Sequence, residues 1–85
     1  MNFSQGIIEK DVHGMNVEEA VKCIESTVRK ADAGIYRIRI IHGYHRGNGI
    51  MQAIREEFAY GREPAVKRIV AGDNPGITEL VLREY

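Results

Sequence analysis

The stretch IYRIRII, residues 35–41, decides the fold because its regular alternation predicts a strand with two different faces. An apolar sheet face has to be covered by other elements, so the pattern predicts a layer of helices on that side. One face of the strand would carry Tyr36, Ile38 and Ile40, and the other would carry Arg37, Arg39 and Ile41.

Toward the N-terminus, the sequence predicts a helix preceded by a shorter strand over Ile7–Val12. Asn16 is a suitable N-cap for this helix, and Glu19 stands where its side chain can bond back to the cap amide. Gly34 is the expected end of the helix. Apolar residues recur at steps of three and four along one helical face: Val17, Ala20, Val21, Ile24 and Val28.

Toward the C-terminus, a glycine-rich turn over 42–49 leads into a second predicted helix over 50–60, which Gly61 and Pro64 close. Two further strands are expected over 66–70 and 77–82. The residues between them include Asp73-Asn74-Pro75-Gly76, which has the composition of a turn, so these strands should pair as a hairpin.

The expected order is therefore β-α-β-α-β-β, in a four-stranded mixed sheet covered by two helices, an α/β two-layer sandwich. The first two strands, joined by a helix, should be parallel. The last strand is expected to present a sheet edge, where a weak dimer could form; otherwise the chain would be a monomer.

Length and composition bound the class of protein. Eighty-five residues make a single domain, with a core expected over residues 7–83. Twelve basic residues balance twelve acidic ones, although basic residues outnumber acidic ones between 35 and 70. The single cysteine, Cys23, cannot form an internal disulfide, and no secretion signal or membrane span is visible. These features favour a cytoplasmic protein.

All three histidines fall in turns that follow predicted strands. In a parallel β-α-β unit, the carboxyl ends of both strands lie at one sheet edge, where α/β folds place ligands. Residues 11–14 and 42–47 should therefore be neighbours. Asp11 and His13 would lie on the same side of their strand, where the carboxylate can fix the tautomer of the imidazole for acid–base chemistry.

The second turn has the composition of an anion site. Glycines let backbone amides converge on one point, and the following helix adds its positive N-terminal dipole. Side chains supply further donors and a ring on which a base can stack. The candidate phosphate-binding residues are His42, Gly43, Tyr44, His45, Arg46 and Gly47, with Arg37 and Arg39 alongside a flanking backbone.

Other interpretations of the same residues stay open. Asp11 and His13 could close a turn without any chemistry, and the 42–49 turn could be a plain connector. Three histidines with Asp11 could ligate zinc, although their spacing matches no known ligand pattern. The anion could also belong to a small-molecule phosphate or nucleotide.

The two turns resemble the motifs of the Smr (small MutS-related) domain family. That family has a Leu-Asp-Leu-His-Gly motif before a glutamate-rich helix, which is similar to residues 10–14 and 15–20 here. It also has a His-Gly-x-Gly-x-Gly motif, similar to residues 42–47, and a terminal hairpin with a Gly-x-Thr pattern, similar to residues 76–78. The likeness spans roughly residues 7–83. Lys10 and His45 depart from the motifs.

The resemblance implies a fold like the C-terminal domain of a bacterial translation initiation factor. It also implies binding of DNA or RNA, structured or branched, and in several members a nicking endonuclease activity that serves DNA repair, recombination or RNA processing. Asp11 and His13 would be the catalytic pair, acting with or without a divalent metal ion, and His42, Gly43 and Gly47 would contact the backbone. The alternative is a non-catalytic adaptor module that binds nucleic acid or a protein.

Overall fold

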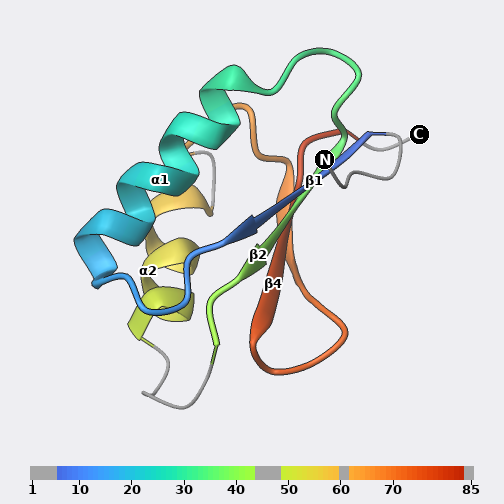
Figure 1. Ribbon diagram of the computed structural model, residues 1–85. Coiled ribbons are helices and arrows are strands. Elements are labelled where there is room, and N and C mark those ends of the chain that lie inside the picture. Colours follow the sequence, from blue (N-terminus) through green and yellow to red (C-terminus); the bar gives the residue numbers. More distant parts are fainter. Residues whose placement is uncertain (1–5, 44–48, 60–61, 84–85) are drawn as a thin grey trace.

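Figure 1 shows a computed structural model of the chain, which describes residues 6–43, 49–59 and 62–83. Its elements follow the predicted β-α-β-α-β-β order, and the strand ends lie within two residues of the predicted ones. Among the described residues, no helix is long and apolar enough to cross a membrane. The elements are β1 (Ile7–Asp11), α1 (Val17–Lys30), β2 (Arg37–Ile41), α2 (Gly49–Phe58), β3 (Arg68–Ala71) and β4 (Ile77–Val81).

The four strands form one mixed sheet in the order β1-β2-β4-β3. β1 is parallel to β2, and β4 is antiparallel to both β2 and β3, as the sequence predicts. The expectation that the last strand forms an edge is wrong, because β4 lies between β2 and β3. Periodicity defines the faces of a strand but not its neighbours, and β1 and β3 are the outer strands of the described sheet.

Both helices cover the same face of the sheet, so the domain has two layers (Figure 1). Ile38 and Ile40 of β2 are fully buried beneath them, which confirms the face predicted from the alternation. The helices contribute the opposite side of this core with Ala20, Ile24, Val28, Ile54 and Phe58.

Helix α1 begins as predicted and ends earlier. The side chain of Asn16 accepts from the amide of Glu19 (2.8 Å), and the Glu19 side chain accepts from the amide of Asn16 (3.1 Å), which completes a capping box. The helix ends at Lys30, with Ala31 as its C-cap, so the prediction of Gly34 is wrong. The Asp32 carboxylate instead accepts from the Gly34 amide (2.8 Å) and forms a separate turn.

The sheet face opposite the helices carries a buried carboxylate between two arginines. The Glu79 side chain is 6% exposed and accepts from Arg37 Nη1 at 2.6 Å and from Arg39 Nε at 3.0 Å. Arg39 also lies 3.6 Å from the carboxylate of Glu9. Because Arg39 and Glu79 are register partners on β2 and β4, this cluster fixes the pairing of the two central strands.

We expect Glu79→Gln to lower the free energy of unfolding by about 1–3 kcal/mol, because two half-buried guanidinium groups lose the buried counter-charge between them. Chemical denaturation measures the loss. The matched control is Glu9→Gln. The Glu9 side chain is 46% exposed, so this substitution should lower the free energy of unfolding by less than about 0.5 kcal/mol. Equal losses in the two variants would contradict the importance of the buried carboxylate.

Candidate functional site

The turns that follow β1 and β2 lie side by side at one edge of the sheet. Asp11 is the register partner of Ile41, and the amide of Val12 donates to the Ile41 carbonyl at 2.9 Å. A Cβ built on Gly43 would lie 3.5 Å from the Cβ of His13. The structure therefore brings residues 11–14 next to 42–43, as the parallel topology predicts (lower end of the sheet in Figure 1).

A β-turn projects His13 from the end of β1. The amide of Met15 donates to the Val12 carbonyl at 3.1 Å, which closes the turn over His13 and Gly14. Gly14 has a φ of +86°, as the third residue of a type II turn requires. No atom lies within 4 Å of a Cβ built on Gly14, so the turn needs glycine for its backbone conformation and not for space.

Asp11 and His13 form an exposed carboxylate–imidazole pair. Asp11 Oδ1 accepts from the His13 amide at 3.0 Å and is hydrogen-bonded to His13 Nδ1. The side chains are 50% and 68% exposed, respectively. The hydrogen bond from the ring lowers the pKa of Asp11 below its ordinary value, with help from the His13 amide and against slight burial. With Nδ1 facing the carboxylate, Nε2 is the ring nitrogen left for a ligand.

His42 occupies the opposite kind of environment, because its side chain is turned into the protein and the residue is only 7% exposed. Its Nδ1 lies 2.7 Å from the Gly43 carbonyl and its Nε2 lies 2.8 Å from Thr78 Oγ1. A carbonyl only accepts, so Nδ1 carries a proton, and in the neutral ring Nε2 accepts from the Thr78 hydroxyl. Both ring nitrogens are thus used inside the fold.

The backbone of the second turn is held by Gly76, the residue before β4. The amides of His42 and Gly43 both donate to the Gly76 carbonyl, at 2.9 and 3.0 Å. Gly43 has a φ of +75°, a conformation that favours glycine. The described geometry therefore gives His42 and Gly43 a role in holding the turn, and phosphate contact by either residue stays a prediction.

A Gly-x-Thr pattern at residues 76–78 is visible in the sequence, but the role of Gly76 and Thr78 in holding the turn was not predicted from it. Thr78 is 1% exposed and Gly76 is buried, and the Asn74 side chain accepts from the Gly76 amide at 2.8 Å. One signal was present, because Thr78 is a polar residue at a position of β4 that faces the helices. A buried hydroxyl needs a partner, and His42 at the end of the neighbouring strand supplies it.

The remaining candidate residues are placed differently. Arg37 and Arg39 lie on the open sheet face with their guanidinium groups bound to Glu79, so their charge is shared with a buried acid. Any contact between these arginines and a nucleic-acid backbone stays a prediction. Four candidates fall outside the described residues: Tyr44, His45, Arg46 and Gly47.

The arrangement of the described side chains does not support the zinc interpretation. Within the described part of the chain, no group of three or more His, Cys, Asp or Glu side chains is arranged to hold a metal ion. Asp11 and His13 bond to each other in the open, while His42 bonds to Thr78 inside.

Two large apolar side chains are exposed beside the Asp11–His13 pair. Met15 is 36% exposed and Val17 is 42% exposed, although the helical periodicity predicts Val17 on the buried face of α1. A Cβ built on Gly49 would lie 3.4 Å from Val17 Cγ2, so the first residues of α1 and α2 meet here. The sheet edge therefore combines the pair, two helix N-termini and a small apolar surface.

Comparisons with known proteins agree with this arrangement. The family model of the Smr domain matches residues 10–74, which include both turns. The chain belongs to the Smr domain family. Its structure is similar to the crystal structure of the Smr domain of Thermus thermophilus MutS2, with a TM-score of 0.75 and 30% sequence identity, over 91% of this chain and 99% of that chain. No curated protein sequence matches the chain.

The Asp11–His13 pair of this Smr domain can be tested in solution. In His13→Ala, we expect the pKa of Asp11 to rise toward its ordinary value, because the ring hydrogen bond that lowers it is lost. Because this pKa is lowered in the folded state, the stabilisation from the pair is present above about pH 4 and is lost as the pH falls through the folded value. The carboxyl carbon shift of Asp11 during an NMR pH titration measures the pKa of this group. An unchanged pKa in the variant would contradict the pairing of Asp11 with His13.

The His42–Thr78 hydrogen bond has its own test. We expect Thr78→Val to lower the free energy of unfolding by about 1–3 kcal/mol, because a buried ring nitrogen loses its partner. Thr78→Ser is the matched control, since it keeps the hydroxyl. Denaturation curves give the two losses, and amide spectra should show His42 and Gly43 displaced in the valine variant alone. A serine variant as perturbed as the valine variant would contradict this role for the hydroxyl.

Proposed function

We propose that this Smr domain binds structured or branched DNA or RNA through the sheet edge formed by residues 11–17 and 42–43, and that Asp11 and His13 cleave one strand there. The observation that carries the proposal is the exposed, mutually hydrogen-bonded Asp11–His13 pair at the carboxyl ends of two parallel strands. The family membership supports it, because the family match covers both turns that form this edge.

The pair supports general acid–base chemistry at a phosphodiester. Asp11 holds Nδ1 of His13, which orients the ring and leaves Nε2 directed to a substrate. Nε2 takes the proton from an attacking water as the water oxygen bonds to phosphorus, and the bond from phosphorus to the leaving sugar oxygen breaks. The leaving oxygen takes a proton from solvent. Cleavage with and without a divalent metal ion are both open to this pair.

The surroundings of the pair suit a nucleic acid that is not a continuous duplex. Met15 and Val17 offer apolar contact for a sugar or an unstacked base next to the phosphate that reacts at the Asp11–His13 pair. The first turns of α1 and α2, which meet at Val17 and Gly49, add the positive ends of two helix dipoles. A hairpin end or a branch point exposes both a bent backbone and unpaired bases, so such substrates fit this edge.

A second candidate function is a non-catalytic adaptor that binds nucleic acid or a protein without cleaving. One observation favours it, because three of the candidate phosphate-binding side chains are engaged elsewhere among the described residues. Arg37 and Arg39 bind Glu79, and His42 binds Thr78. In the absence of these donors, the edge would recognise its ligand by shape and leave it intact.

The test separates binding from cleavage. We expect the domain to bind labelled hairpin and branched DNA and RNA in fluorescence anisotropy, and to lose affinity steeply between about 50 and 200 mM salt, since phosphate contacts release counterions. In His13→Ala, cleavage should fall by about 10²–10⁴-fold while the affinity changes little, because the ring takes a proton from the attacking water during the reaction. Lys22→Gln, an exposed change on α1 away from the pair, is the control and should alter neither.

Each outcome decides one part of the proposal. Binding without cleavage, with and without divalent metal ions, would establish the adaptor function. Equal cleavage by the His13→Ala variant and the parent would remove the catalytic role of His13. No measurable affinity for any of these nucleic acids at 50 mM salt would contradict the whole proposal.

A further inference from the structure

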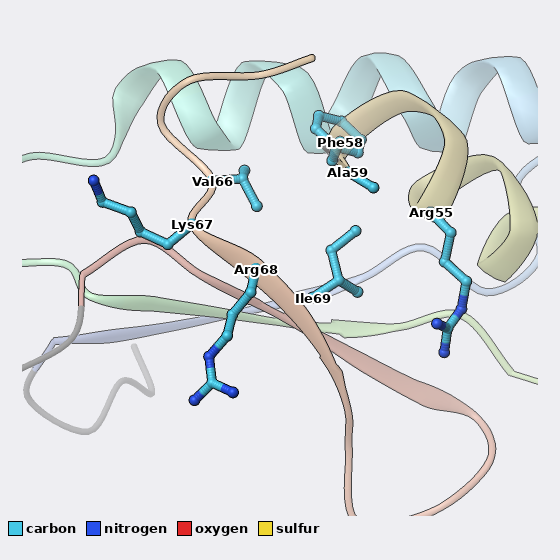
Figure 2. Close-up of a pocket in the computed structure, with 7 residues that line it drawn as sticks. All are labelled: Arg55, Phe58, Ala59, Val66, Lys67, Arg68 and Ile69. Atoms are coloured by element: carbon cyan, nitrogen blue, oxygen red, sulfur yellow. The ribbon is translucent and has the colours of Figure 1, made fainter. Parts of the chain in front are cut away.

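An open hollow lies between α2 and the edge strand β3, away from the Asp11–His13 pair. Its volume is about 410 Å³. Figure 2 shows Phe58 and Ala59 at the end of α2 above Ile69 of β3, with Val66 beside them. Phe58 and Val66 are buried, while Ile69 and Ala59 are partly exposed. The floor of the hollow is therefore apolar and reachable from solvent.

The rim of this hollow is basic. Arg55, Lys67 and Arg68 line it together with the apolar floor, and all three residues are exposed. None of the described residues that line it is acidic. Among the described residues, neither Arg55 nor Lys67 takes part in an ion pair. Figure 2 shows Arg55 and Lys67 directed away from each other, on either side of Ile69.

The backbone of β3 is free to pair along the same hollow. Within the described sheet, β3 has β4 as its neighbour on one side and no strand on the other. The Gly72 amide donates to the Ile77 carbonyl at 2.9 Å, and hydrogen-bonded pairs alternate along antiparallel strands. Arg68 and Val70 therefore pair toward β4, and Ile69 and Ala71 direct their N–H and C=O groups outward.

From these features we infer that the α2–β3 edge binds an extended acidic peptide, which adds to the sheet as a strand beside β3. The peptide backbone pairs with Ile69 and Ala71, and an apolar side chain enters the hollow over Ile69. Side chains two positions away on the same face lie toward Arg55 and Lys67, so acidic residues there complete the fit. The recognised pattern is acidic–x–apolar–x–acidic.

The exposed main chain favours a peptide over a nucleic acid at this edge. A strand edge alternates N–H and C=O groups, and the carbonyls repel phosphate while a peptide strand satisfies both. The hollow is also remote from the proposed nucleic-acid edge. β1 and β3 are three strand spacings apart, which separates the two edges by about 14 Å. Ile69 in the hollow aligns through β4 and β2 with Ile8, toward the end of β1 opposite Asp11.

The probe is a fluorescein-labelled peptide of about nine residues, with aspartate, valine and glutamate at alternate central positions and threonine between them. A peptide of the same composition in scrambled order is the ligand control. We expect saturable binding with a dissociation constant below about 1 mM, and amide shifts at residues 55–59 and 66–71 of the whole chain. The scrambled peptide should bind at least about fivefold more weakly, because it loses the alternation.

Two variants separate the contribution of the rim charges to peptide binding from that of the β3 backbone. Arg55→Gln with Lys67→Gln should weaken binding about fivefold or more and reduce its dependence on salt, since it removes rim charges. Ala71→Pro removes an outward N–H from the edge strand, where proline leaves the pairing to β4 in place, and should abolish strand addition. Lys22→Gln on α1 is the matched control and should bind as the parent does.

The outcomes are decisive for the acidic-peptide site. Peptide binding at these residues that is weakened by both changes and spared in Lys22→Gln supports it. Absence of peptide binding at 1 mM, shifts confined to other residues, or full binding by both variants would overturn it. Displacement of the peptide by a short single-stranded oligonucleotide that shifts the same amides would reassign the edge to nucleic acid. None of these results bears on the Asp11–His13 pair.

Discussion

The buried hydrogen bond between His42 Nε2 and Thr78 Oγ1 connects the candidate site to the core of the sheet. His42 is the first residue after β2, and Thr78 lies on β4, so the bond ties the end of one central strand to the start of its neighbour. The Gly76 carbonyl reinforces this link by accepting from the amides of His42 and Gly43. With the second turn fixed in this way, Gly43 is held next to His13, within 3.5 Å of its Cβ as measured from a Cβ built on Gly43, beside the turn that presents the Asp11–His13 pair.

This arrangement assigns opposite roles to two histidines that look alike in sequence, since both precede a glycine at the end of a strand. His13 is exposed, and its ring meets a carboxylate that belongs to the same turn. His42 is buried, and both of its ring nitrogens are hydrogen-bonded inside the protein. In a small domain, one histidine that anchors and one that faces solvent allow a rigid edge to carry a reactive group.

Patterns that repeat along the chain were predictable from sequence, and contacts between distant segments were not. The alternation around Ile38 and Ile40 correctly gave the buried face of β2, and the spacing of Asn16 and Glu19 correctly gave the start of α1. The Smr resemblance of the two turns is confirmed by the family match. The position of β4 was missed, because strand periodicity carries no information about strand order.

A turn formed by a side chain after α1 and contacts between distant strands explain the other differences between the predictions and the structure. Gly34 suggested a helix end, but the Asp32 side chain forms its own turn after the helix has ended at Lys30. The inward role of His42 depends on Thr78, 36 residues away, so no local pattern could reveal it. The charges of Arg37 and Arg39 looked available in sequence because their partner, Glu79, lies on another strand.

The central claim is that the edge formed by the two turns is the surface that meets nucleic acid. An amide-shift titration of the whole chain with a short DNA or RNA hairpin tests it most directly. The structure predicts shifts at residues 11–17 and 42–43 that saturate together and weaken with added salt. Shifts confined to the open face of the sheet, or to residues 55–59 and 66–71 at the far edge, would contradict it.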